Sequence, residues 1–185
     1  MTTRHMILTG LFAALIIISS QVSIPIGPVP HTLQVFFVML AGITLGGRWG
    51  FASVLVWVAL GTFGLPVFAQ GKAGAAHLLG PTGGFLLGFA LCALLVGWLS
   101  ERVSLSYGKI LLVMLAGLAV VYAVGLAGFM ASFAFFLKKP MTVDKAMALS
   151  VLPFLPFDIV KTAIAAYAGV KIRRALIRAG LVAEK

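Results

Sequence analysis

Long apolar runs separated by short polar or Pro/Gly-rich connections dominate the hydropathy pattern of this chain. A helix that crosses a bilayer needs roughly 20 mainly apolar residues, and backbone groups in lipid must satisfy one another within the segment. The pattern therefore predicts six transmembrane helices, at about residues 6–24, 32–45, 51–68, 85–99, 110–137 and 149–170. A single all-α membrane domain would cover residues 1–185, with a basic cytoplasmic tail at 171–185.

Proline and glycine residues mark the connections between these runs. The loop Pro25–Pro30 contains three prolines, which cannot continue a helix, so the first helix is expected to stop there. The second run, at roughly 14 residues, is short for a crossing and is expected to be tilted or shielded by its neighbours. A glycine-rich loop is expected at Gln70–Gly84. Pro153 and Pro156 are expected to interrupt the sixth helix near its start.

The composition excludes a soluble globular protein. Hydrophobic residues make up 62% and charged residues 10% of the 185 positions, against roughly 45–50% and 25% in ordinary soluble domains. The net charge of +10 arises from 14 Lys and Arg against 4 Asp and Glu. These basic residues flank apolar runs, a placement that sets membrane topology and leaves no polar surface for nucleic acid. We therefore expect a lipid bilayer, and no nucleic acid, as a partner.

The sequence also argues against an enzyme. Gly71-Lys72 is followed by Ala73, so the sequence has no Walker A loop for ATP phosphates. The three histidines lie in terminal or loop positions without catalytic or metal-ligand spacing, and Cys92 is the single cysteine. We expect no cofactor and no metal site, so a transporter built on this chain would take its energy from a partner.

Basic residues are distributed unevenly over the two sides that six crossings would create. Both termini would share one side, which would carry nine Lys and Arg residues against four on the other. The positive-inside rule then predicts that both termini are cytoplasmic. Trp49 and Trp98 fall at segment ends on that same side, where indole rings favour the membrane interface.

Asp158 is the one carboxylate inside an apolar run. Lys161 follows three residues later, so on a helix the two side chains share a face and can pair or grip one ligand. Ionisable groups at membrane depth normally face a protein interior or a wet cavity, and the nearby prolines would free backbone carbonyls beside them. Such a pair suits a small uncharged head with N–H beside C=O, such as a urea or amide ring. An ion pair that only stabilises packing is the alternative.

Other polar residues have two interpretations each. Gln34 can hydrogen-bond a ligand or join two helices. Thr32 can cap the second helix, and His31 is either a ligand contact or a hydrated loop residue. Pro81 and Thr82 stand where the fourth helix could begin, so free N–H groups there could hold a carboxylate, or the glycines could make a close-packed turn.

Small residues on the first helix could let another helix approach closely. Gly10 with Ala14, and Thr9 with Ala13, are each four positions apart and therefore share a helix face. This spacing fits packing inside the bundle and docking of a partner subunit equally well.

Four ordered motifs resemble those of the BioY family of biotin transporters. They lie at Pro28–Gln34, Gly61–Phe68, Leu79–Gly84 and Pro153–Asp158 with Lys161, and the resemblance covers about residues 9–174. Members of this family are the substrate-binding S components of energy-coupling factor (ECF) transporters in prokaryotic cell membranes. The resemblance implies an S-component-like bundle of six membrane helices and a biotin pocket near the extracellular side. It also implies a complex with a transmembrane coupling protein and two ATP-binding cassette ATPases.

The resemblance implies roles for individual residues as well. Asp158 and Lys161 match the acid–lysine pair expected at the ureido ring of biotin. Gln34 and Thr32 match a Thr-Leu-Gln element beside the pocket. The biotin carboxylate would face a helix N-terminus or Lys72.

Two further regions match the family pattern. Thr82 and Gly83 match the loop that enters the fourth helix, and Phe85 stands where the family commonly has tyrosine. The region that docks on the coupling protein is matched by Gly10, Ala13 and Ala14. An S component for another small vitamin, or a small structural membrane subunit, stays as an alternative to biotin uptake.

Overall fold

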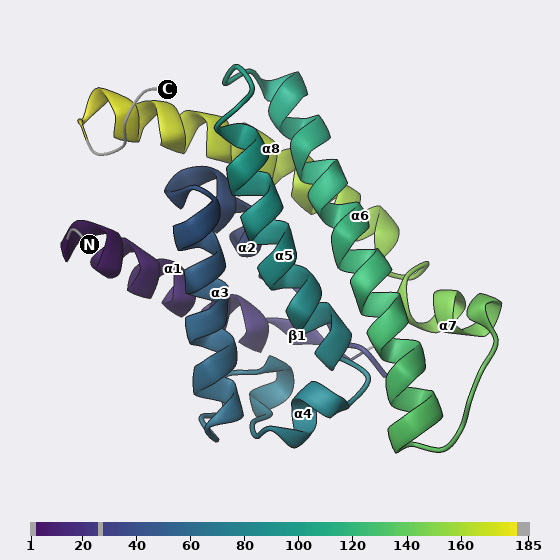
Figure 1. The fold of residues 1–185 in the computed structure, drawn as a ribbon. Coiled ribbons are helices and arrows are strands. Elements are labelled where there is room, and N and C mark those ends of the chain that lie inside the picture. The colour runs from purple at the N-terminus through teal and green to yellow at the C-terminus, as the bar shows by residue number, and fades with distance from the viewer. Residues whose placement is uncertain (1–2, 26–27, 181–185) are drawn as a thin grey trace.

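The computed structural model describes residues 3–25 and 28–180, which form a bundle of helices (Figure 1). The longest helices among these residues are α1 (Thr3–Gln21), α2 (Gln34–Leu45), α3 (Gly47–Thr62), α5 (Gly83–Ser100), α6 (Tyr107–Ala131) and α8 (Leu155–Arg178). Shorter elements connect them: β1 (Ser23–Ile24), β2 (His31–Thr32), η1 (Ala69–Gly71), α4 (Ala76–Leu79), η2 (Ser132–Phe136) and α7 (Val143–Ser150). The predicted all-α class is confirmed.

Each predicted apolar run contains one long helix, but the third helix ends earlier than its run. α3 stops at Thr62 instead of about residue 68. The Leu65 N–H donates to the oxygen of Leu60 at 3.1 Å, and the Gly64 N–H donates to Gly61 at 3.2 Å. Gly64 has φ of 101°, a left-handed conformation that glycine adopts without a Cβ clash, so the helix closes in a Schellman motif.

The end of the sixth predicted helix requires a correction. α8 runs from Leu155 to Arg178 instead of from about 149 to 170, so the first half of the expected tail at 171–185 is helical. Arg173, within that stretch, is buried, and its guanidinium donates to the main-chain oxygen of Ile43 at 3.1 Å. Residues 181–185 of the expected tail lie outside the described residues.

Pro153 and Pro156 do interrupt the polypeptide where expected. α7 and α8 meet at a bend of 53°, with Pro153 between them and Pro156 in the first turn of α8. Proline is tolerated in a first turn because the N–H it lacks has no partner there in any case. Residues 143–148, expected as part of a connection, and residues 149–150, expected to begin the sixth helix, together form the helix α7.

α2 is a short helix at the centre of the bundle. Its 12 residues span roughly 18 Å at 1.5 Å per residue, less than the ~30 Å of a bilayer core. Packing against α1, α3, α5 and α8 buries nearly its whole length. The expectation that this segment is shielded by its neighbours is therefore confirmed.

α5 and α6 pack closely over the same core. A Cβ atom on Gly84 of α5 would lie 2.7 Å from the Cα of Gly128 in α6, so the two backbones meet at glycine pairs where a side chain would prevent contact. α6 also packs against α8, where the Tyr122 hydroxyl meets Asp158 in the first turn of α8.

The bundle has two distinct ends. Both termini lie at one end, where the Arg4 guanidinium donates to the main-chain oxygen of Gly180 at 3.3 Å. The segment with β1 and α4, and the helix α7, lie at the other end (Figure 1). Three described helices are long and apolar enough to cross a bilayer, or four when α7 and α8 count as one bent span, while α2 is a shorter apolar helix.

Candidate functional site

A narrow cavity of about 50 Å³ lies at the end of the bundle that carries α4 and α7. Its walls come from the N-terminal ends of α2, α5 and α8, the middle of α6 and the connecting segments around β2, η1 and α4. This volume is far below the ~300–1,000 Å³ of typical ligand pockets. A ligand larger than a few water molecules therefore requires the walls to move apart.

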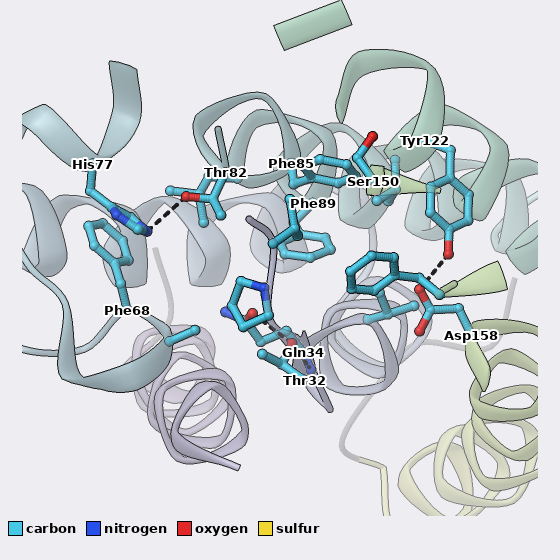
Figure 2. A pocket seen from close by; sticks show the side chains of 17 residues that line it. Thr32, Gln34, Phe68, His77, Thr82, Phe85, Phe89, Tyr122, Ser150 and Asp158 are labelled. Carbon is cyan, nitrogen blue, oxygen red and sulfur yellow. Dashed lines mark hydrogen bonds between the residues drawn. The ribbon is translucent and has the colours of Figure 1, made fainter. Parts of the chain in front are cut away.

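One end of the cavity carries a buried carboxylate, Asp158, with two donors, of which Figure 2 shows Tyr122. The Tyr122 hydroxyl donates to Asp158 Oδ2 at 2.7 Å, and the Lys161 ammonium donates to Asp158 Oδ1 at 2.7 Å. Asp158 is 5% exposed. A carboxylate buried this far needs charge-assisted partners, and each of its oxygens keeps a lone pair that can accept a further N–H.

Lys161 connects this carboxylate to the loop between α1 and α2. Its ammonium also donates to the main-chain oxygen of Thr32, at 2.7 Å. Beside it, the His31 ring stacks on Phe154 with centroids 3.9 Å apart. These contacts hold β2 against the first turn of α8, so the loop forms part of the cavity wall.

The side-chain amide of Gln34 lies between the Asp158 end and the rest of the cavity. The Thr32 hydroxyl donates to Gln34 Oε1 at 2.8 Å, which leaves the amide nitrogen as the free end. This Nε2 atom is buried and has no hydrogen-bond partner among the described residues. A buried donor without a partner costs roughly 1–3 kcal/mol, so the site is arranged for an acceptor that a ligand could supply.

Aromatic rings line the middle of the cavity. Figure 2 shows Phe85 and Phe89 of α5 between the polar groups, with Phe68 farther toward α4. Phe85 fills the space opposite Gly125 of α6, where a Cβ atom would overlap its ring. These rings suit an apolar portion of a ligand, since they bury large apolar area without polar atoms.

A second polar group lies at the far end of the cavity. His77 Nε2 and the Thr82 hydroxyl share a hydrogen bond of 2.9 Å, and the His77 ring stacks on Phe68 at 4.9 Å. Burial, and then the nearby positive charge of Lys72, lower the pKa of His77 below its ordinary value. The cavity is thus an apolar passage between an acid with donors and a group that can hydrogen-bond an anion.

Five of the eight predicted ligand-contacting residues line this cavity: Thr32, Gln34, Thr82, Phe85 and Asp158. Lys161 does not line the cavity, but its ammonium contacts Asp158, which does. Lys72 is exposed on the outer side of His77. Gly83 is the buried first residue of α5, where a Cβ atom would overlap the oxygen of Leu78. No group of three potential metal-ligating side chains gathers anywhere in the described part of the chain.

Some of the N–H groups that were expected to be free at the start of α5 already donate hydrogen bonds within the chain. The Gly83 N–H donates to the oxygen of Gly80 at 3.1 Å, and the Phe85 N–H donates to Thr82 at 3.0 Å. The close-packed turn that the glycines also suggested is therefore the better description of this segment. At this end of the cavity, the Thr82 hydroxyl and the His77 ring are the polar groups on the lining.

Sequence analysis missed three polar residues of the cavity: Tyr122, His77 and Ser150. Tyr122 lies in the middle of the fifth apolar run, and a phenol at that depth was a signal, because a buried hydroxyl needs a partner. His77 lies in the glycine-rich segment, where nothing local indicated that it would turn inward. The apolar residues Phe68, Phe89 and Phe154 were also not distinguishable from packing residues.

The small residues of α1 separate into two faces. Gly10 and Ala14 are exposed on the outside of the bundle, beside the exposed side chains of Leu11 and Ile18. Ala13 is 2% exposed and packs inside the bundle. Of the three residues expected to dock a partner, Gly10 and Ala14 are accessible on the outer surface and Ala13 is not.

Comparisons with known proteins agree on one family. The family model described as the BioY family matches residues 1–178. The biotin transporter BioY of Thermotoga maritima is 42% identical over 171 residues, covering 92% of this chain and 96% of that protein. The probable biotin transporter BioY of Pyrococcus horikoshii is 43% identical over 166 residues, covering 89% and 93%. A crystal structure of the S-component for biotin from an ECF-type ABC transporter superposes with a TM-score of 0.83 at 30% identity, covering 94% of this chain and 95% of the other.

Proposed function

The chain belongs to the BioY family, and from that premise we propose that it is the biotin-capturing S component of an ECF-type uptake transporter. One observation carries the proposal beyond the family: a buried acid with two donors stands at one end of an apolar passage, and a second hydrogen-bonding group stands at the other. Biotin has a matching shape, with a ureido ring at one end, a carboxylate at the other and apolar atoms between.

The ureido ring binds at the Asp158 end of the cavity. Its N–H groups donate to the carboxylate of Asp158, whose two oxygens each retain a lone pair beside Lys161 and Tyr122. The ureido oxygen accepts from the Gln34 amide nitrogen, which has no other partner among the described residues. Binding thus satisfies a buried donor that folding alone leaves without one.

The rest of biotin lies along the aromatic passage. Its sulfur-containing ring and hydrocarbon tail pack against Phe85 and Phe89, and its carboxylate reaches the Thr82 hydroxyl near His77. Lys72, outside this group, attracts the anion as it enters. Phe85 contributes only apolar surface, since a phenylalanine offers no hydroxyl to hydrogen-bond the ligand.

The small cavity volume supports a closing mechanism. Biotin needs more than the 50 Å³ of the cavity, so it enters when Val29, Pro30 and the Gly71–Gly84 loop move away from the helices. Closure restores the hydrogen bond between Lys161 and the oxygen of Thr32, which seals the site from one side. Release to the other side follows when partner subunits reorient the chain, because the sequence has no phosphate-binding loop of its own.

A transmembrane coupling protein and two ABC ATPases complete the transporter. The exposed strip of α1 with Gly10 and Ala14 supports docking of the coupling protein, because small residues let a partner helix approach closely. No atom lies within 4 Å of a Cβ built on Gly10, so this position is open to a neighbour.

Six crossings of a prokaryotic cell membrane with both termini in the cytoplasm agree with the charges. The end that holds both termini also carries Arg48, Arg102 and the arginines of α8, whereas Lys72, Lys138 and Lys139 lie toward the other end. The positive-inside rule then directs the biotin cavity to the external face. α2 and α3, with 12 and 16 residues, cross as parts of the bundle because neighbouring helices cover them.

Equilibrium binding of labelled biotin to the purified chain in detergent tests the proposal. We expect one-to-one binding that desthiobiotin displaces and that riboflavin and thiamine leave unchanged. Absence of biotin binding by folded protein would overturn the substrate assignment. The same preparation would then be titrated with other small vitamins, the alternative substrates for an S component of this fold.

A further inference from the structure

A second cavity, of about 490 Å³, lies near the end of the bundle that holds both termini. Three arginines of α8, Arg173, Arg174 and Arg178, line one wall. The end of α5 and the segment after it line the other, through Ser100, Glu101 and residues 103–105. This cavity is separate from the biotin cavity, which lies near the opposite end of α8. The proposed transport function leaves it without a role.

Two of these arginines are held by hydrogen bonds from their guanidinium groups to neighbouring segments. The guanidinium of Arg173, which is 7% exposed, donates to the Ser100 hydroxyl at 2.9 Å and to the oxygen of Ile43 at 3.1 Å. The guanidinium of Arg174 donates to the oxygen of Leu105 at 2.7 Å. Each of these contacts uses one nitrogen of a planar group with five N–H donors, so donors remain for an anion.

Arg178 completes the positive wall. Its side chain is exposed and makes no hydrogen bond or ion pair within residues 3–25 and 28–180. Glu101 is the carboxylate on the described lining, and it lies against Gly46, where a Cβ atom would overlap its Oε1 atom. Three positive charges and one negative charge leave the lining positive.

The apolar part of the lining distinguishes a lipid from a soluble anion. Val103, Leu105 and Ile177 share the walls with the arginines, so the cavity is amphipathic. At the same end of α5, the Arg102 guanidinium stacks over the Trp98 ring at 3.6 Å, and Trp98 is 48% exposed. Exposed tryptophan beside arginine is typical of the level of lipid headgroups.

We propose that this cavity binds the phosphate of an anionic phospholipid headgroup from the cytoplasmic leaflet. Arg174 and Arg178 hold the phosphate oxygens, and the apolar wall takes the glycerol and the first methylene groups of the acyl chains. Basic pockets between membrane helices on the cytoplasmic side recognise such headgroups by this combination of charge and shape. The site does not depend on the identity of the transported vitamin.

Native mass spectrometry of the purified chain, titrated with phosphatidylglycerol or phosphatidylcholine in detergent, tests the proposal. We expect retention of phosphatidylglycerol over phosphatidylcholine, and Arg178→Gln to weaken phosphatidylglycerol binding roughly fivefold. Arg48→Gln is the matched control, because Arg48 is an exposed arginine at the same end that does not line the cavity. Equal retention of both lipids, or equal effects of the two substitutions, would overturn the proposal.

Two further arms separate a lipid from a free anion and binding from folding. Inorganic phosphate should displace little phosphatidylglycerol; full displacement at millimolar phosphate would contradict a lipid site. Ser104→Trp fills the cavity at an exposed position without changing charge and should also reduce retention. Melting temperatures confirm that each variant is folded, and retention by a folded Ser104→Trp equal to that of the unmodified chain would contradict the assigned location.

Discussion

The ammonium of Lys161 lies 2.7 Å from the main-chain oxygen of Thr32, which joins α8 to β2 across 129 positions of the chain. The same ammonium holds the Asp158 carboxylate at 2.7 Å. A ligand that binds to this carboxylate therefore contacts a residue whose partner, the Lys161 ammonium, also holds the loop between α1 and α2 in place. Because one cation makes both contacts, ligand binding and loop position are coupled through it.

Substitutions at Asp158 and Lys161 should separate stability from ligand binding. Lys161→Met leaves a buried carboxylate without its cation and should lower the free energy of unfolding by roughly 3–5 kcal/mol. The double variant Asp158→Asn with Lys161→Met removes both charges and should restore most of that loss. Biotin affinity should fall at least roughly tenfold in the single and the double variants, because the ligand loses charged hydrogen-bond partners. Melting temperature and biotin titration measure the two effects. Affinity within twofold of the unmodified chain would refute the site.

Tyr122→Phe tests the second donor to the carboxylate. The substitution removes the hydroxyl that donates to Asp158 Oδ2 at 2.7 Å while keeping the ring. A hydrogen bond to a charged group contributes roughly 1.5–3 kcal/mol, so we expect biotin binding to weaken about tenfold as the acid loses its fixed orientation. Tyr167→Phe is the control, since Tyr167 is 56% exposed and does not line the cavity. Similar titration curves for both variants would contradict this role.

Gln34→Leu should weaken ligand binding without lowering stability. The amide nitrogen of Gln34 is buried without a partner among the described residues, and its removal relieves a penalty of roughly 1–3 kcal/mol. The substitution also removes the acceptor of the Thr32 hydroxyl, a bond worth roughly 0.5–1.5 kcal/mol. We therefore expect little change in melting temperature without ligand and roughly tenfold weaker biotin binding. Thr44→Val provides the matched control, because Thr44 Oγ1 is also buried without a partner there but lies outside the cavity. It should leave affinity unchanged, and a similar loss in both variants would count against a ligand contact.

Hydropathy located the long helices because lipid allows few backbone arrangements. An apolar run must become a helix, and prolines and glycines end it, so the positions of α1, α5 and α6 follow from local sequence. The i,i+3 spacing likewise predicted the pairing of Asp158 with Lys161, which lie 2.7 Å apart. These features depend on residues that are close in the chain.

The features that sequence analysis missed depend on residues far apart in the chain. Tyr122 meets Asp158 because α6 packs against α8, and this contact joins positions 36 residues apart. Arg173 looked like part of a solvated tail because its partners, Ile43 and Ser100, belong to other helices. Local periodicity carries no information about which face of one helix meets which face of another.

His77 should make stability depend on pH. Burial and Lys72 lower its pKa in the folded protein, so the unfolded chain, with an ordinary histidine pKa near ~6.5, binds the proton more readily. Stability is therefore fully present above that value and is lost as pH falls through it, until the folded protein also takes up the proton. Melting temperature against pH should show this loss, and His77→Gln should reduce it. Thr82→Val keeps the buried histidine ring and should retain the loss of stability at low pH. The same dependence of melting temperature on pH in all three proteins would contradict the assignment.

Gly10→Leu and Ala14→Leu should separate capture of biotin from its uptake. Both positions are exposed on α1, and a side chain on Gly10 meets nothing within 4 Å in this chain, so folding and biotin affinity should not change. The added bulk would block close approach of the coupling protein, and we expect uptake by cells with the complete transporter to fall at least roughly tenfold. Ala119→Leu, an equally exposed position on α6, controls for added bulk on the lipid-facing surface. Normal uptake by the α1 variants would place the docking surface elsewhere, whereas lost biotin binding would show that these substitutions disturb the bundle itself.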